Sequence, residues 1–266
     1  GWDQVGTKEL ISSVTHEQFV DYCSKLYTPD NTVIALAGNV DHEEVVAQIK
    51  KLFTFKNLNK SLEFAPFTGL SRERRLSLRD KKTEQAHIVV GYPGYPDQDK
   101  KYYPAKLLSI VLGGNMSSRM FLSVREAQGL AYYISTTTDE YMDTGTISTS
   151  AGVSVERIDQ AIQAVIEEYK KAADSGITAA ELKKAKDFLK GKLVLRLEDS
   201  EEYAHLLGKY QLLFNENKLP EDIMREVDEV TVEQVNEVAK ELFKQEELRI
   251  SVIGPYDDEA KFLKFL

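Results

Sequence analysis

The amino-acid sequence predicts an α+β fold that contains one complete domain and the tail of a second, similar domain. Three observations predict it: runs rich in β-branched and aromatic residues, helical runs between them, and an internal repeat of a helix–strand unit. The 266 residues suffice for one domain and part of another.

Strand-like and helical segments follow one another along most of the chain. Apolar residues recur at three- and four-residue spacing from Val155 to Tyr169 and from Leu182 to Leu193, which predicts two helices. Thr178 and Glu181 have the spacing of a capping box that opens the second helix. The segments predicted as strands are 32–38, 86–92, 130–138, 145–152 and 248–254.

The repeat aligns residues 14–43 with residues 230–259 without a gap. Each copy reads as a capping box, a helix, a strand, a glycine and an Asp-capped helix. Duplication explains one ungapped register better than chance. The identical pairs are Val14 and Val230, Thr15 and Thr231, Glu17 and Glu233, Gln18 and Gln234, Leu26 and Leu242, Ile34 and Ile250, Gly38 and Gly254, Asp41 and Asp257, and Glu43 and Glu259.

The repeat also predicts the domain boundaries. A long stretch from about Arg72 precedes the second copy, whereas the first copy begins near residue 1. We therefore expect residues 1–56 to be the tail of a domain whose first part, about 140 residues, lies upstream. Residues 57–71 are predicted to be a linker because Asn, Ser, Pro and Gly interrupt any period, and residues 72–266 to be a complete domain.

Composition excludes several classes of function. The net charge of −9 argues against nucleic-acid binding, which needs clustered Lys and Arg. No apolar run is long enough to span a membrane, and the first residues do not resemble a signal peptide. The lone Cys23 fits a reducing compartment, so we expect a cytoplasmic, bacterial-type location. Cys23 shares a predicted helix face with Phe19 and Leu26, so we expect a small buried apolar group.

No metal site is predicted in this chain. His16 and His42 each precede a glutamate, but neither has the second histidine four positions later that a zinc helix needs. His87 and His205 belong to no motif. No serine lies in a G-x-S-x-G turn, and the glycine pair in 111–121 is predicted to end a helix rather than bind phosphate.

Four separated segments resemble one family in order and spacing. These segments are LYTPDNTVIALAGNVDHEEV (26–45), LSIVLGGNMSSRMFLSVREAQGLAYYIS (108–135), AKDFLKGKLVLRLEDSEEYA (185–204) and VTVEQVNEVAKELF (230–243). The last three are similar to the C-terminal homologous domain of the pitrilysin/insulinase family of zinc metallopeptidases, in the bacterial branch that resembles mitochondrial processing peptidase. The first, 26–45, resembles the closing segment of that family's first domain.

The resemblance implies duplicated α/β-sandwich domains, each with a mostly antiparallel sheet and helices on one face, closing as a clamshell on peptide substrates. It implies zinc in the intact protein, bound by an H-x-x-E-H motif and a distal glutamate in an N-terminal domain, with the glutamate of the motif as base. Those ligands lie outside this chain. The implied partners are the N-terminal region or a partner chain of the same family, and a homodimer is possible.

Arg125 and Tyr132 are the site residues that the resemblance implies. Their implied role is to bind the substrate backbone and to stabilise the oxyanion of the tetrahedral intermediate, with the guanidinium and the phenol as donors. Strand alternation argues differently, since it would send Tyr133 to the polar face instead. Arg125 also has an alternative as a surface residue paired with Glu126 or Glu140.

Two questions therefore stay open at the level of sequence. The chain is either a fragment or part of a protein with a degenerate first domain, and GTKELI (6–11), which resembles the segment after the zinc site, favours a fragment. The predicted function is the substrate-clamping C-terminal part of a zinc-dependent endopeptidase, inactive by itself. The alternatives are a non-catalytic structural or partner subunit of the same fold and an unrelated α+β binding module.

Overall fold

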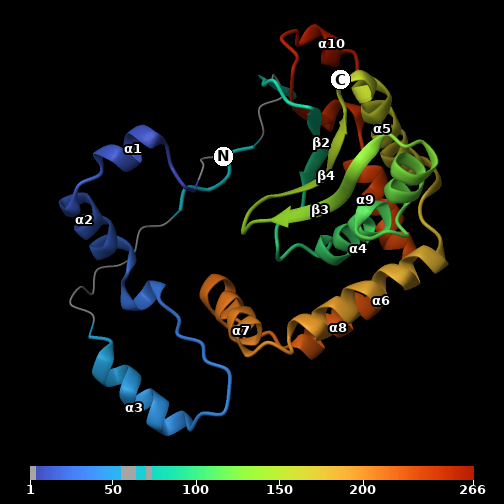
Figure 1. The fold of residues 1–266 in the computed structure, drawn as a ribbon. Helices are drawn as coiled ribbons and strands as arrows, with labels where there is room; N and C mark the ends of the chain where they lie inside the picture. The colour runs from blue at the N-terminus through green and yellow to red at the C-terminus, as the bar shows by residue number, and fades with distance from the viewer. Residues whose placement is uncertain (1–3, 55–63, 70–73) are drawn as a thin grey trace. The chain divides into compact units, whose positions relative to one another are not determined.

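The chain divides into two compact units. The computed structural model describes residues 4–54, 64–69 and 74–266 (Figure 1). The smaller unit comprises Gly1–Ala65 and Arg196–Leu219, and the larger unit comprises Pro66–Leu195 and Pro220–Leu266.

The predicted domain boundaries remain a prediction. Of the predicted linker, residues 57–63 and 70–71 lie outside the described residues, and residues 64–69 form neither helix nor strand. Residues 196–219, which the sequence assigned to the C-terminal domain, group with the smaller unit.

A five-stranded sheet with the order β1-β5-β2-β4-β3 is the centre of the larger unit. β1 and β5 run parallel, whereas the other neighbouring strands run antiparallel. The predicted strands at 86–92, 130–138, 145–152 and 248–254 are confirmed, whereas β1 was not predicted. The strands are β1 (Leu76–Asp80), β2 (Gln85–Gly94), β3 (Ala131–Glu140), β4 (Gly145–Ser154) and β5 (Arg249–Gly254).

Helices cover one face of this sheet. In β2, Ala86, Ile88 and Val90 are buried, while His87 and Val89 between them are exposed. The buried face contacts α4, α5 and α9 (Figure 1). The expected α+β sandwich with helices on one face is therefore confirmed. The helices from residue 102 onward in the larger unit are α4 (Tyr102–Gly113), a π-helix (Phe121–Ala127), α5 (Ile158–Ser175), α6 (Ala179–Arg196), α8 (Pro220–Glu229), α9 (Val232–Leu242) and α10 (Ala260–Leu263).

The glycine pair at the end of α4 has a packing role. A Cβ on Gly113 would lie 2.2 Å from Thr136 Oγ1 and 2.5 Å from the Thr136 amide nitrogen. Only glycine therefore lets α4 approach β3 this closely. Gly114 ends α4, as predicted, so the Gly-Gly sequence serves close helix–strand packing.

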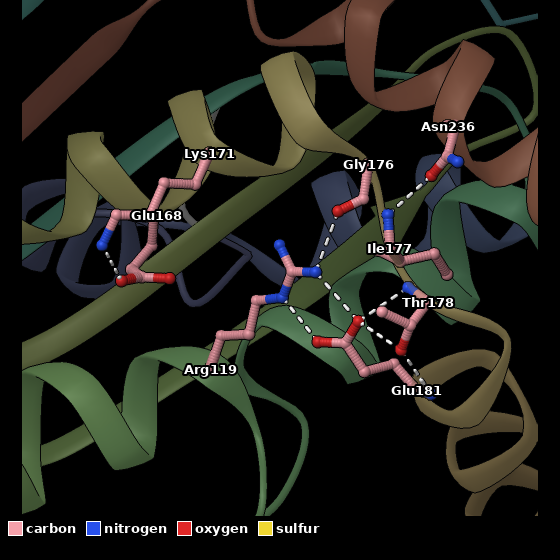
Figure 2. A network of polar contacts seen from close by, with 8 residues as sticks. All are labelled: Arg119, Glu168, Lys171, Gly176, Ile177, Thr178, Glu181 and Asn236. Atoms are coloured by element: carbon pink, nitrogen blue, oxygen red, sulfur yellow. Dashed lines mark hydrogen bonds and ion pairs between the residues drawn. The ribbon is translucent and has the colours of Figure 1, made fainter.

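A polar clasp fixes the connection between α5 and α6 (Figure 2). Arg119 donates through Nε and Nη2 to the two Glu181 carboxylate oxygens, at 2.6 and 2.9 Å, and also donates to the Gly176 carbonyl. Glu181 in turn accepts from the Thr178 amide at 2.8 Å, which confirms the predicted capping box. Asn236 of α9 accepts from the Ile177 amide at 2.7 Å. The clasp thus joins the segment before the π-helix, α6 and α9.

Glu181→Gln is expected to lower the free energy of unfolding of the larger unit at pH 7 by about 2 to 3 kcal/mol. The hydrogen bond from Arg119 is the main cause that holds the pKa of Glu181 at about 2, below its ordinary value of 4.5. A carboxyl with a lowered folded-state pKa stabilises the fold above its unfolded pKa and loses that effect as the pH falls. The difference between wild type and Glu181→Gln should therefore shrink between pH 4.5 and about 2.

Hydrogen exchange of the β2 and β4 amides under denaturant measures this difference. Asp187→Asn is the matched control, because Asp187 lies on the same helix in an exposed ion pair with Lys183, and exposed pairs contribute little to stability. A stability difference for Glu181→Gln that stays constant from pH 7 to pH 2 would contradict the assignment.

The smaller unit contains amphipathic helices that bury none of their residues. They are α1 (Lys8–Ser13), α2 (His16–Leu26) and α3 (His42–Leu52), and α7 (Ser200–Phe214) belongs to the same unit. Residues 32–38, predicted as a strand, pair with no strand among the described residues. The expectation that Cys23 is buried is wrong, because its side chain is exposed and no described segment packs over this face of α2.

The capping boxes of both copies and the cap at Asp41 are nevertheless confirmed, whereas Asp257 caps no helix among the described residues. Thr15 with Gln18 and Thr231 with Gln234 form complete capping boxes. Asp41 caps α3. In the second copy Asp258, one residue after the predicted position, accepts from the Ala260 amide. None of the helices formed by described residues is both long and apolar enough to cross a bilayer.

Candidate functional site

Arg125 lies in the last turn of the π-helix Phe121–Ala127 and is half-buried. Its guanidinium carbon is 4.6 Å from the centroid of the Phe121 ring, a distance that suits a cation–π contact. Its side chain makes no hydrogen bond or ion pair with the described part of the chain. The suggested pairing with Glu140 is absent there, since Lys106 donates to Glu140 at 2.9 Å instead.

A short connection ties this π-helix to the start of β3. The Gly129 amide donates to the Arg125 carbonyl at 3.1 Å, and the Leu130 amide donates to the Val124 carbonyl at 3.0 Å. Gly129 adopts a positive φ of 57°, which glycine tolerates at no steric cost. Val124 and Leu130 are both buried and anchor the two ends of the connection. The backbone that carries Arg125 is therefore held against the strand that follows.

Tyr132 occupies a β-bulge at the start of β3. Ala131 pairs with Val153 and Tyr133 pairs with Gly152, so Tyr132 is the extra residue. The bulge breaks the alternation that would place Tyr132 on the buried face with Ile134. Tyr132 is accordingly 58% exposed. The start of β3 beside Gly129 is thus irregular, and strict alternation of buried and exposed residues would wrongly predict that Tyr132 is buried.

Tyr133 lies across the open face of the sheet. A Cβ on Gly152 would stand 2.4 Å from Tyr133 Cε1, so the ring lies directly over this glycine of β4. The Tyr133 hydroxyl lies 3.1 Å from His87 Nδ1 on β2. Gly152 is the register partner of both Tyr133 and His87. Tyr133 is therefore engaged within the sheet, whereas the ring and hydroxyl of Tyr132 have no such partner among the described residues.

β3 is an edge strand of the sheet. It pairs with β4 along one side only, so its other side leaves backbone donors and acceptors without a partner strand in this sheet. Such an edge accepts an extended peptide as an additional strand. Arg125 precedes β3 in the sequence, and Tyr132 occupies the β-bulge at the start of β3. Sequence reasoning did not find the edge, because strand order is a long-range property.

The described residues offer no metal centre. No group of three or more His, Cys, Asp or Glu side chains within them is arranged to hold a metal ion. His16 and His42 are the first residues of α2 and α3, His87 lies in β2 and His205 lies in α7. These residues do not fit a zinc site, and no chemical step in this chain is assigned to a metal.

Comparison with known proteins identifies a family and longer relatives. The family profile described as peptidase M16 inactive domain matches residues 13–189. An uncharacterized zinc protease of Mycobacterium leprae is 34% identical over 257 residues, covering 95% of this chain and 57% of the relative. An uncharacterized zinc protease of Bacillus subtilis is 32% identical over 259 residues, covering 96% of this chain and 61% of the relative. The chain thus spans less than two thirds of these relatives.

Solved structures share the fold. A protease from Helicobacter pylori matches with a TM-score of 0.81 and 24% identity, over 94% of this chain and 61% of that chain. A peptidase M16 inactive domain from Pseudomonas fluorescens matches with a TM-score of 0.84 and 22% identity, over 96% of this chain and 61% of that chain. At these identities the structural likeness supports the fold and nothing finer.

Proposed function

Because this chain belongs to the family of peptidase M16 inactive domains, we propose that it is the substrate-clamping C-terminal part of a zinc-dependent endopeptidase. Its relatives in Mycobacterium leprae and Bacillus subtilis are named zinc proteases, and each is longer than this chain. In this proposal the zinc is held by residues outside the chain. The N-terminal region of the same protein, or a partner chain of the same family, supplies them, and a homodimer is one form that the working particle takes in this proposal.

The role of this chain is to bind the peptide backbone. The observation that carries the proposal is an arginine whose guanidinium has no acceptor among the described residues and whose backbone is hydrogen-bonded to the start of an edge strand. An exposed tyrosine occupies the bulge at the start of that strand. Arg125 supplies a rigid set of donors and Tyr132 supplies one hydroxyl donor. Both groups suit the oxygen of a scissile carbonyl as it gains negative charge. The free edge of β3 suits the extended backbone beside it.

A non-catalytic subunit of the same fold is the alternative. Such a subunit has less need of an arginine whose donors have no acceptor among the described residues, so Arg125 favours the peptidase. The zinc content and the peptidase activity of the isolated chain and of the full-length protein distinguish a peptidase from a non-catalytic subunit.

The isolated chain is expected to bind no stoichiometric zinc and to cleave no peptide, whereas the full-length protein binds zinc and cleaves. The reason is that the described residues lack a set of metal ligands. Metal analysis after dialysis against zinc, with cleavage of a quenched fluorescent peptide, measures both properties on both proteins. One tightly bound zinc per isolated chain would contradict the division of roles. A full-length protein that cleaves no member of a diverse peptide library would favour the non-catalytic subunit.

A further inference from the structure

The guanidinium of Arg125 lies over the ring of Phe121, which comes four residues earlier on the same π-helix. Side chains at this spacing are neighbours on one face of a helix. The guanidinium carbon is 4.6 Å from the centroid of the ring. Among the described residues, no carboxylate or carbonyl accepts from this guanidinium, so the ring is the group that orients it.

Phe121 is itself held in place by the core of the larger unit. Its half-buried side chain packs against the buried core residues. Met120, the preceding residue, and Val124, one turn later, are both fully buried. Because protein cores are close-packed, a ring that packs against one has little freedom to move. Phe121 is therefore a rigid support for the longer and more flexible side chain of Arg125.

The backbone that follows Arg125 is also fixed. The Gly129 amide donates to the Arg125 carbonyl at 3.1 Å. Arg157 donates through its two terminal nitrogens to the carbonyls of Gln128 and Gly129, at 3.3 Å each. The main freedom left to this donor is rotation of the Arg125 side chain, which costs entropy to order. A contact that orders the side chain in advance leaves less entropy to be lost when a ligand binds.

An aromatic ring attracts a cation through the negative face of its π-system and leaves the N–H donors of an arginine available. Arg119 shows the opposite arrangement (Figure 2). Its donors go to both carboxylate oxygens of Glu181 and to the Gly176 carbonyl. Arg119 thus serves the fold, whereas Arg125 is oriented and still able to donate.

We propose that Phe121 is a positioning residue, which holds the Arg125 guanidinium ready to donate to the carbonyl oxygen of a bound peptide. This inference rests on the proposed function, in which Arg125 meets the developing oxyanion. A donor that is already oriented needs no reorganisation at the moment of reaction. Weakening the attraction of the ring should therefore slow the chemical step, although Phe121 itself touches no reacting atom.

Fluorination of the ring tests the proposal, because fluorine withdraws electron density from the ring face and leaves the size of the ring nearly unchanged. In the full-length protein, phenylalanine with one, two and three fluorines at position 121 should lower kcat/KM stepwise, by about 3- to 10-fold in total. The loss should appear in kcat with KM nearly constant, as for an interaction made only in the transition state. In an Arg125→Ala background the same series should have no further effect. Steady-state cleavage of a quenched fluorescent peptide measures these rates.

Phe188 is the matched control. It is half-buried on α6, and the ammonium of Lys192, also four residues later, lies 5.9 Å from the centroid of its ring. Trifluorinated phenylalanine at position 188 weakens a contact of the same kind away from Arg125, so kcat/KM should change by less than about twofold.

The outcomes separate this inference from the proposed function. A flat fluorine series at position 121, with Arg125→Ala impaired, would overturn the role of Phe121 and leave the proposed function standing. A series that rises would also overturn it, because the ring would then compete with the peptide for the guanidinium. Equal losses at positions 121 and 188, or the same loss in the Arg125→Ala background, would assign Phe121 to packing alone. Unchanged kinetics for Arg125→Ala would overturn both this inference and the proposed role of Arg125.

Discussion

Arg125→Ala in the full-length protein is expected to lower kcat/KM for a peptide substrate by about 100- to 1,000-fold, the loss typical of removing one donor to a developing oxyanion. The guanidinium makes a contact with the Phe121 ring and no hydrogen bond or ion pair to the described residues. Its donors are therefore available to a ligand, and the fold does not depend on them. Arg125→Lys should recover only part of the rate. A guanidinium can donate two N–H groups to the same carbonyl oxygen from one rigid plane, whereas an ammonium has no such planar pair of donors.

Arg79→Ala is the control for the change in net charge. Arg79 is an exposed residue of β1, at the opposite edge of the same sheet, and its removal should change kcat/KM by less than about threefold. The melting temperature should change little in either alanine variant, since Arg79 is exposed and the Arg125 side chain makes no hydrogen bond or ion pair with the described residues. Unchanged kinetics for Arg125→Ala would remove Arg125 from the site, and a matching loss of stability would assign it a structural role.

The features that sequence could predict are local ones. The Thr178–Glu181 capping box was readable because its residues lie three positions apart, and the structure confirms it. Its partner Arg119 lies 62 positions away, and no periodicity connects them. The same limit applies to the sheet. Strand composition located β2, β3, β4 and β5, but the order that places β3 at the edge depends on pairings across the whole larger unit.

The prediction for Cys23 failed for an instructive reason. Helical periodicity identifies the apolar face of a helix, but it does not identify the segment that packs against that face. The stripe that contains Cys23 is correct as a pattern, and its counterpart in α9 is buried. Among the described residues no element covers the face of α2 that contains Cys23.

Tyr132→Phe is expected to lower kcat by about 100-fold or more, whereas Tyr133→Phe should change it by less than about threefold. The bulge exposes Tyr132 and leaves it without a register partner. The Tyr133 hydroxyl instead lies 3.1 Å from His87 Nδ1, and the Tyr133 ring packs over Gly152. Phenylalanine at position 133 keeps the ring over Gly152 and loses only a hydrogen bond near the surface.

A Tyr133→Ala variant separates positioning from direct contact. Removing the ring uncovers Gly152 and frees the start of β3, so Tyr132 loses a support for its position in the bulge. If Tyr133 acts through Tyr132, its alanine variant should impair the wild-type enzyme and have little further effect in the Tyr132→Phe background. Additive losses would mean that Tyr133 meets the substrate itself. Kinetics in which Tyr133→Phe alone is impaired would transfer the donor role from Tyr132 to Tyr133, because only the hydroxyl differs between these variants and the wild type.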